Sequence, residues 1–204
     1  EMFIASAGTT SGSGLRFQNE GHLIYPTDGQ GTVSNGDLDL GNSSFQFKDL
    51  YLAGGVVFGS TGGSVSSKTL DDYEEGTWSP VLTDLTNNAT MHSLSGGVYT
   101  KIGRLVTCTA NVRTTSLGSV SGGLYLSGFP FSSANTNGNN GAGSVANAEN
   151  MAITAGHAIT LFYGKNSNSA RFDIYDHSGG VTVLQSSEWT SDGQACISVT
   201  YSTA

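Results

Sequence analysis

The chain has 204 residues, of which 29 are glycine and only 12% are charged. This charged share is about half of what soluble domains usually carry, and glycine-rich turns between short apolar bursts are typical of many brief strands. The net charge of −8 repels phosphate backbones and anionic lipids, which disfavours nucleic acids and membrane surfaces as partners. No apolar run approaches the roughly 20 residues of a membrane-spanning helix, so we expect no membrane insertion.

Residues 5–69 alternate short strand patterns with glycine turns. Leu15 and Phe17 lie on one face of a predicted strand, and the turn at 19–21 leads into a returning strand at 22–25, which predicts a hairpin. Later i, i+2 apolar pairs are Leu38 with Leu40, Phe45 with Phe47, Leu50 with Leu52, and Val56 with Phe58. Strands this short bury few side chains, and isolated hairpins are marginal in water. We therefore predict that this region folds only together with further copies of the chain.

A linker and then longer strand patterns follow. Residues 59–69 read GSTGGSVSSKT and form the clearest linker, and SSANTNGNNGAG at 132–143 is predicted to be a mobile loop. The predicted strands from residue 76 onward are 77–82, 98–102, 105–112, 123–127, 144–148, 158–163, 170–175, 181–185 and 195–201. Their spacing of roughly a dozen residues fits an antiparallel sandwich or jelly roll. No segment keeps a helical apolar period for more than two turns.

Two cysteines, Cys108 and Cys196, each lie inside an alternating apolar stretch, LVTCTANV and QACISVTY. This pattern favours two small buried thiols on strands. The alternative is a disulfide between them, which requires that the two strands face each other. No Cys-x-x-Cys or Cys-His spacing indicates a metal site.

An acidic run of Asp71, Asp72, Glu74 and Glu75 follows the linker. Calcium needs about six or seven oxygen ligands around a tight turn, and the run lacks the glycine and the alternating spacing for it. Carboxylates adjacent in sequence rarely face each other across a scissile bond. The pattern therefore favours a solvated or inter-subunit acidic run.

The four histidines, His22, His92, His157 and His177, have no metal-binding spacing. No GxSxG motif or Ser-His-Asp order stands out from the serine background. We therefore predict no catalytic residue, no metal and no cofactor, and we do not expect an enzyme.

A sugar-binding surface needs an aromatic ring for the apolar side of a pyranose and polar or carboxylate groups for its hydroxyls. Residues 162–177 and 186–192 supply both kinds of side chain. The candidate ligand-binding residues are Trp189, Tyr163, Tyr175, Asp176, His177, Glu188 and Asp192. Trp189 is singled out because it lies in the polar stretch SSEWTSD, although a tryptophan that closes the end of the sandwich explains it as well.

Two phrases carry a family resemblance, LGNSSFQFKDLYLAGGVVF at 40–58 and LDDYEEGTWSP at 70–80. Together they resemble the distal part of bacteriophage tail fibres, as do GVYTKIGRLVTCTANV at 97–112 and the Phe129-Pro130-Phe131 phrase. The resemblance implies three copies of the chain. It also implies that the acidic run joins a fibre shaft to a terminal β-domain whose core includes Trp78, Tyr99 and Ile102. Phe129, Pro130 and Phe131 are likewise expected to be packing residues of that domain.

The expected fold is all-β, an extended intertwined trimeric β stem followed by a C-terminal antiparallel β-sandwich that is jelly-roll-like. The stem is expected at 1–58, a linker and acidic junction at 59–75, and the tip domain at 76–204. The resemblance implies a homotrimeric receptor-binding tip that attaches the virion to a host cell-surface polysaccharide or lipopolysaccharide, with upstream fibre domains as further partners. Such a tail fibre belongs to the virion and is assembled in the bacterial host cytoplasm. A connector without receptor contact and a polysaccharide-modifying tailspike enzyme stay open as alternatives.

Overall fold

The computed structural model describes residues 2–6, 12–19, 21–36, 38–57, 69–70, 72–176 and 178–204. The chain divides into two compact units, Glu1–Ala53 and Gly54–Ala204. Most of the predicted linker, residues 59–68, and Asp71 of the acidic run lie outside the described residues. No helix long and apolar enough to cross a membrane occurs among the residues that were described.

The first unit contains a three-stranded antiparallel sheet in the order β1 (Met2–Ala5), β2 (Ser13–Phe17) and β3 (Ile24–Asp28). Phe17 pairs with Ile24, so the predicted hairpin is confirmed. In the described part of this unit the buried residues are Gly14, Thr27 and Gly29, and no large apolar side chain is among them. The part of the first unit that the structure describes therefore has no hydrophobic core of its own.

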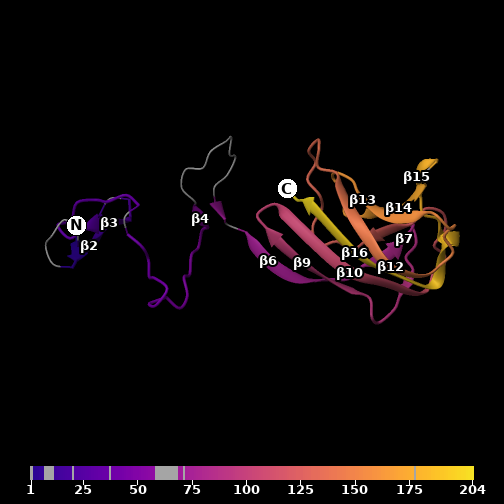
Figure 1. The fold of residues 1–204 in the computed structure, drawn as a ribbon, viewed down its shortest axis with the longest axis horizontal. Coiled ribbons are helices and arrows are strands. Elements are labelled where there is room, and N and C mark those ends of the chain that lie inside the picture. Colours follow the sequence, from indigo (N-terminus) through magenta and orange to yellow (C-terminus); the bar gives the residue numbers. More distant parts are fainter. Residues whose placement is uncertain are drawn as a thin grey trace. The chain divides into compact units, whose positions relative to one another are not determined.

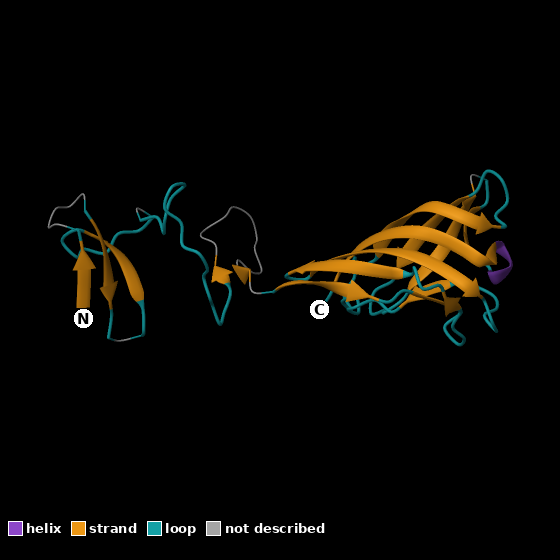
Figure 2. Ribbon diagram, turned by 90° about the horizontal axis from the view of Figure 1, so that it is seen from below, coloured by secondary structure: helices purple, strands orange, loops and turns teal. Residues whose placement is uncertain are grey.

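The second unit begins with a small pair of strands, β4 (Val56–Val57) and β5 (Thr69–Leu70). Eleven further strands form one antiparallel sheet (Figures 1 and 2). These strands are β6 (Tyr73–Trp78), β7 (Val81–Thr83), β8 (Thr90–Met91), β9 (Gly96–Ile102), β10 (Leu105–Ser116), β11 (Tyr125–Ser127), β12 (Gly141–Met151), β13 (Ala158–Tyr163), β14 (Ala170–Asp176), β15 (Gly180–Val183) and β16 (Trp189–Ser202). Their order is β6-β9-β10-β16-β12-β13-β14-β11-β7, with β15 beside β14 and β8 beside β10.

The all-β prediction is confirmed, and each strand predicted from residue 76 onward overlaps an observed one. The apolar pairs Leu38 with Leu40, Phe45 with Phe47 and Leu50 with Leu52 lie in loops, so these strand patterns form no strand. The strand predicted at 77–82 is divided between β6 and β7 at Ser79 and Pro80, because proline has no backbone N–H to donate to a neighbouring strand. Only the first part of the predicted loop at 132–143 is loop, since β12 begins at Gly141. The strands belong to one continuous curled sheet, where we expected the two stacked sheets of a sandwich.

The curled sheet encloses a core of inward-facing side chains, to which β10, β13, β14 and β16 contribute. Trp78 stacks on Phe129 with 4.6 Å between ring centroids, and Phe129 meets Tyr163 edge-on at 4.8 Å. The predicted core positions Trp78 and Phe129 are confirmed, and Tyr99 packs against the core while half-buried. Ile102 is exposed, so its core assignment is wrong. It lies near the end of β9 on the outer face of the sheet.

The two cysteines are free, and they face opposite sides of the sheet. Cys108 pairs with Val199 across β10 and β16, whereas Cys196 pairs with Asn111. Positions 108 and 111 are three residues apart on β10, so their side chains point to opposite faces. Cys108 is buried, which raises its pKa to about 11. The expectation of two buried thiols therefore fails for Cys196, which is exposed, and the disulfide left open is not formed.

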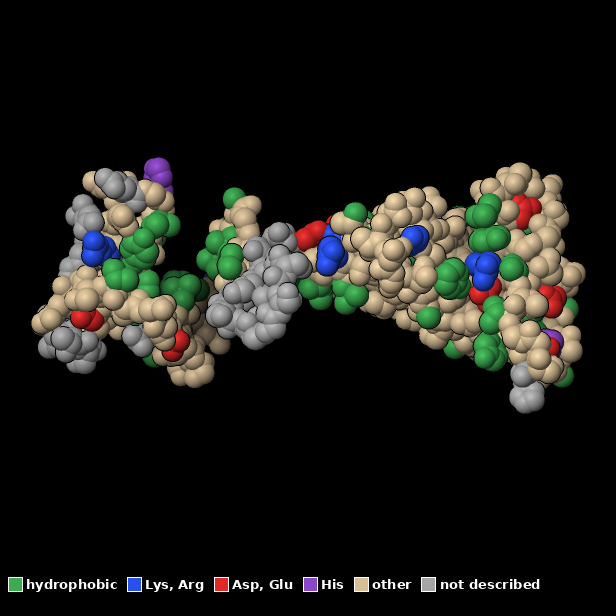
Figure 3. Space-filling view, turned by 90° about the horizontal axis from the view of Figure 1, so that it is seen from above, with side chains coloured by type: hydrophobic (Ala, Val, Ile, Leu, Met, Phe, Trp, Pro, Cys, Tyr) green, Lys and Arg blue, Asp and Glu red, His purple; other side chains and the backbone are tan. Residues whose placement is uncertain are grey.

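Charged side chains are sparse on the surface, as the composition suggests. On the face drawn in Figure 3, Lys, Arg, Asp and Glu lie singly or in small groups among uncharged side chains. Uncharged groups, both polar and apolar, therefore make up most of this surface.

Candidate ligand-binding site

The outer face of β14 carries the clearest combination of aromatic and charged side chains in the described structure. Arg171, Asp173 and Tyr175 alternate along the strand, so their side chains share one face. Cross-strand pairing extends this face into three rows, Tyr125–Arg171–Phe162, Val183–Asp173–Thr160 and Val181–Tyr175–Ala158. We call these nine residues the β14 platform.

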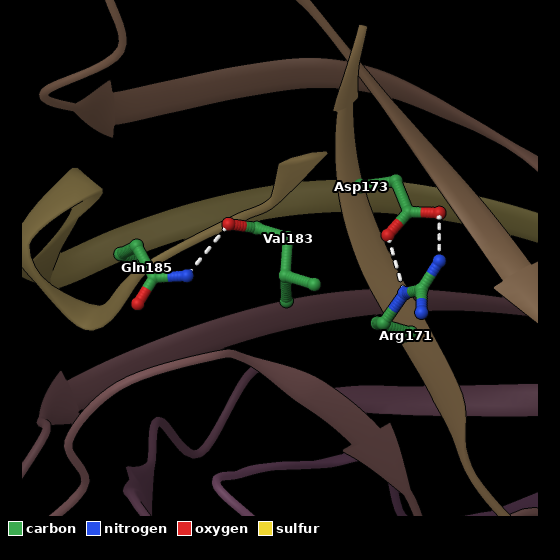
Figure 4. Close-up of polar contacts among 4 residues, drawn as sticks. All are labelled: Arg171, Asp173, Val183 and Gln185. Carbon is green, nitrogen blue, oxygen red and sulfur yellow. Dashed lines mark hydrogen bonds and ion pairs between the residues drawn. The ribbon is translucent and has the colours of Figure 1, made fainter. Parts of the chain in front are cut away.

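Arg171 is fixed in the middle of the platform by a bidentate ion pair. Its Nε donates to Oδ1 of Asp173 at 2.6 Å, and its Nη2 donates to Oδ2 at 3.0 Å (Figure 4). The hydrogen bond to Asp173 raises the pKa of Arg171, and the guanidinium also lies 5.3 Å from the ring centroid of Phe162. Among the described residues nothing bonds to Nη1, so its two N–H groups are available to a ligand.

A groove of about 580 Å³ adjoins Arg171 and is lined by Val181, Thr182, Val183, Gln185, Ser187 and Glu188. A short 3-10 helix, Ser186–Glu188, forms part of its wall. The backbone N–H of Gln185 donates to Oε2 of Glu188 at 2.8 Å. Nε2 of Gln185 donates to the carbonyl oxygen of Val183 at 2.8 Å (Figure 4). These bonds hold both side chains and leave Oε1 of each as an acceptor.

The groove therefore presents donors and acceptors together with little net charge. Asp173, which is 4% exposed, neutralises Arg171, and Glu188 adds one negative charge. Val181 and Val183 supply apolar surface. The volume lies within the range of about 300–1,000 Å³ that small-ligand sites occupy. A hydroxyl-rich ligand matches this mixture of groups, since each hydroxyl both donates and accepts.

Two of the predicted ligand-binding residues are core residues. Trp189 is 1% exposed, and its Nε1 donates to Oγ1 of Thr114 at 3.0 Å. Tyr163 is fully buried, and its hydroxyl donates to the carbonyl oxygens of Phe131 and Ser167. Both occupy inward-facing positions on their strands, so the prediction that their rings stack on a sugar is wrong.

The other predicted residues do not form one site. Tyr175 is 57% exposed on the β14 platform, and Glu188 lines the groove. Asp176 holds the turn that follows β14, where the backbone N–H and the hydroxyl of Ser178 donate to it and lower its pKa. Asp192 lies outside the groove. Its carboxylate accepts hydrogen bonds from the amide of Asn150 and the hydroxyl of Thr190. His177 lies outside the described residues.

Among the residues that the sequence analysis missed, Phe162, Arg171, Asp173 and Gln185 carry the aromatic and polar groups of the site. The spacing of Arg171 and Asp173 was a usable signal, because residues i and i+2 of a predicted strand share a face. Phe162 could not be paired with Arg171 without knowing the register between β13 and β14.

The described carboxylates of the acidic run each bond within the chain. Asp72 forms an ion pair with Nζ of Lys101, whose side chain is almost fully buried. Glu74 accepts the hydroxyl hydrogen of Tyr99, and Glu75 accepts that of Tyr73. In the described ranges no group of three or more His, Cys, Asp and Glu is placed to hold a metal ion. Asp72 therefore anchors the start of β6, and it is not simply solvated as expected.

No protein-family model and no curated protein matches the sequence. Among solved structures, the fold is similar to that of the Dettilon tailspike protein (gp208), with a TM-score of 0.56 at 19% sequence identity. The match covers 64% of this chain and 24% of that chain. This fold is similar to part of a phage tailspike.

Proposed function

We propose that this protein is a phage tail component that attaches the virion to a host cell-surface polysaccharide or lipopolysaccharide through the groove beside Arg171. The observation that carries the proposal is the fixed guanidinium, which lies next to an aromatic ring and lines the same groove as the acceptors of Gln185 and Glu188. The tailspike-like fold supports a place in a phage tail. No catalytic step is part of the proposal.

Recognition at this site relies on groups that are already ordered. Asp173 and Phe162 hold the Arg171 guanidinium, so little side-chain freedom is lost when its Nη1 donates to a sugar oxygen. Oε1 of Gln185 and of Glu188 accept from sugar hydroxyls, and the exposed ring of Tyr175 offers an apolar face. One such site binds weakly, and several copies on one particle convert weak contacts into firm attachment.

The proposal includes a homotrimer. The described residues of the first unit bury no large apolar side chain, while Phe45 is 77% exposed and Tyr51 is 91% exposed. A single chain of this kind has too little buried apolar surface to offset the entropy of ordering its backbone. Further copies that cover these side chains supply the missing core, and the resemblance to phage tail fibres supplies the number three.

Binding of the purified full chain to an array of bacterial surface oligosaccharides tests the proposal. The test variant is Arg171→Met combined with Asp173→Leu, which removes the ion pair without leaving either charge unpaired. Arg104→Met, at an exposed arginine that lies outside the groove, is the matched control. We expect the double variant to lose about tenfold or more in affinity and the control to bind like the wild type.

Equal binding by the double variant and the control would overturn the proposed site. Absence of binding by the wild type to any surface oligosaccharide would favour a connector without receptor contact. Shortening of the bound polysaccharide by the wild type would assign the protein as a tailspike enzyme instead.

A further inference from the structure

The outer face of β6, β9, β10 and β16 differs from the β14 platform because it is almost free of charge. Its positions follow from the pairing of the four strands. They form the rows Tyr73–Ile102–Leu105–Ser202, Glu75–Thr100–Thr107–Thr200, Thr77–Val98–Thr109–Ser198 and Gly96–Asn111–Cys196. We call these fifteen residues the β9 face. Glu75 is the one charged residue among them, and it accepts the hydroxyl hydrogen of Tyr73.

Large apolar side chains are exposed on the β9 face. Tyr73, Ile102 and Leu105 are neighbours in one cross-strand row, and each is about half exposed or more. Val98 is 57% exposed in another row. Beside Val98, a shallow groove of about 360 Å³ runs past Gly96, Thr109, Asn111 and Cys196. Contiguous apolar surface of this kind is uncommon on a face that stays in water.

Charge indicates which partner fits this face. The chain carries 16 acidic and 8 basic residues, so two copies repel each other over most of their surfaces. On the β9 face one residue in fifteen is charged, so little repulsion between copies arises there. Depletion of charged residues is also the compositional mark of the buried centre of an interface. Its hydroxyl groups can bond to one another, as Thr107 and Thr200 do at 3.1 Å.

We propose that the β9 face is a contact surface between copies of this chain. A second copy covers the row formed by Tyr73, Ile102 and Leu105 and occupies the groove beside Gly96. This contact adds to the one proposed for the first unit, and it does not depend on polysaccharide binding at the β14 platform. Covering the face also removes Cys196 from solvent.

The chain contains a probe position that leaves its own fold undisturbed. A Cβ atom added at Gly96 meets no atom within 4 Å, and the backbone of Gly96 is not in the left-handed region. Glutamate at this position therefore fits the single chain and places a negative charge on the β9 face. Val181→Glu is the matched control, because Val181 is exposed on a strand of the β14 platform.

Cys196 is the natural reporter of the contact. The full-length purified protein is treated with an aromatic disulfide reagent, and the rate of thiol release is measured for the wild type, Gly96→Glu and Val181→Glu. Thiol reactivity requires access to the sulfur, so we expect Gly96→Glu to react at least about tenfold faster than the wild type and the control. Equal rates for wild type and Gly96→Glu would overturn the proposal.

Cys108 shows whether a variant is folded, because it is buried and reacts only on unfolding. If both cysteines of Gly96→Glu react rapidly, the variant is unfolded, and the reaction rate of Cys196 in the wild type becomes the test. Slow reaction of wild-type Cys196 relative to a free cysteine peptide supports the covered face. A wild-type rate equal to that of the peptide contradicts it, since Cys196 is exposed in the single chain.

Discussion

Arg171 and Asp173 form a bidentate ion pair on a strand surface, with the carboxylate 4% exposed and the guanidinium open on one side. The two residues are neighbours on one face of β14, so one strand positions the whole pair. The burial of Asp173 gives the pair a structural role. Its carboxylate has lost water and depends on Arg171 for compensation.

Replacing Arg171 alone is therefore expected to destabilise the fold. Arg171→Met leaves a buried, unpaired carboxylate and should lower the free energy of unfolding by about 1–3 kcal/mol. The double variant Arg171→Met with Asp173→Leu should recover most of this loss, because both charges are gone. Urea denaturation at neutral pH measures the difference. A double variant as unstable as the single one would show that the pair does not compensate a buried charge.

Trp189 is expected to affect stability and not ligand binding. Trp189→Phe keeps an aromatic ring in the core and removes the bond from Nε1 to Thr114, whose side chain is fully buried. The loss should be about 1–2 kcal/mol, since the hydroxyl of Thr114 loses a donor. Thermal denaturation and oligosaccharide binding are measured on the same sample. Reduced affinity with unchanged stability would restore Trp189 as a ligand contact.

Asp84 is expected to make stability depend on pH. The backbone N–H groups of Asn87, Ser121 and Thr86 donate to its carboxylate and hold its pKa far below the ordinary value. Because the pKa of Asp84 is lower in the folded state, its ionised carboxylate stabilises the fold at pH values above the unfolded-state pKa, which is near 4. This stabilisation is lost as the pH falls from about 4 toward the lower pKa of the folded state.

The comparison of wild type and Asp84→Asn checks this dependence. At pH 7 the variant should melt at a lower temperature than the wild type, because asparagine offers one oxygen where the carboxylate offers two. The gap should narrow as the pH approaches 2. A gap that is constant between pH 7 and pH 2 would mean that the Asp84 charge contributes nothing to the fold.

The mass of the particle in solution tests the proposed homotrimer. Light scattering on the full chain should give three times the chain mass of 21.0 kDa at micromolar concentration. Truncation to residues 72–204 retains the curled sheet and separates the contribution of the first unit. A full chain that is stably folded as a monomer would contradict the idea that other copies complete its core.

The strand pattern was predictable, and the arrangement of the strands was not. Alternation of apolar residues placed β13 at its observed bounds, and Trp78 and Phe129 were correctly assigned to the core. The pairing of β10 with β16 joins segments far apart in sequence, so no local pattern reveals it. The single curled sheet follows from such long-range pairs.

The candidate site shows the same division. Trp189 begins β16 inside a polar stretch. Which residues of β16 face the core is evident only from the alternation of later residues such as Ile197 and Val199. Trp189 was selected as a ligand contact because its sequence neighbours are polar, yet its side chain is buried. Arg171 and Asp173 could have been found from their i, i+2 spacing, whereas the groove needs β15 and the 3-10 helix in their folded positions.

A crystal structure of the full chain with an oligosaccharide that the array selects tests the central claim most directly. The account predicts that a sugar oxygen accepts a hydrogen bond from Nη1 of Arg171, and that a sugar hydroxyl donates to Oε1 of Gln185 or Glu188. An oligosaccharide seated elsewhere on the chain, for example beside Asp192 and Asn150, with an empty groove at Arg171, would contradict it.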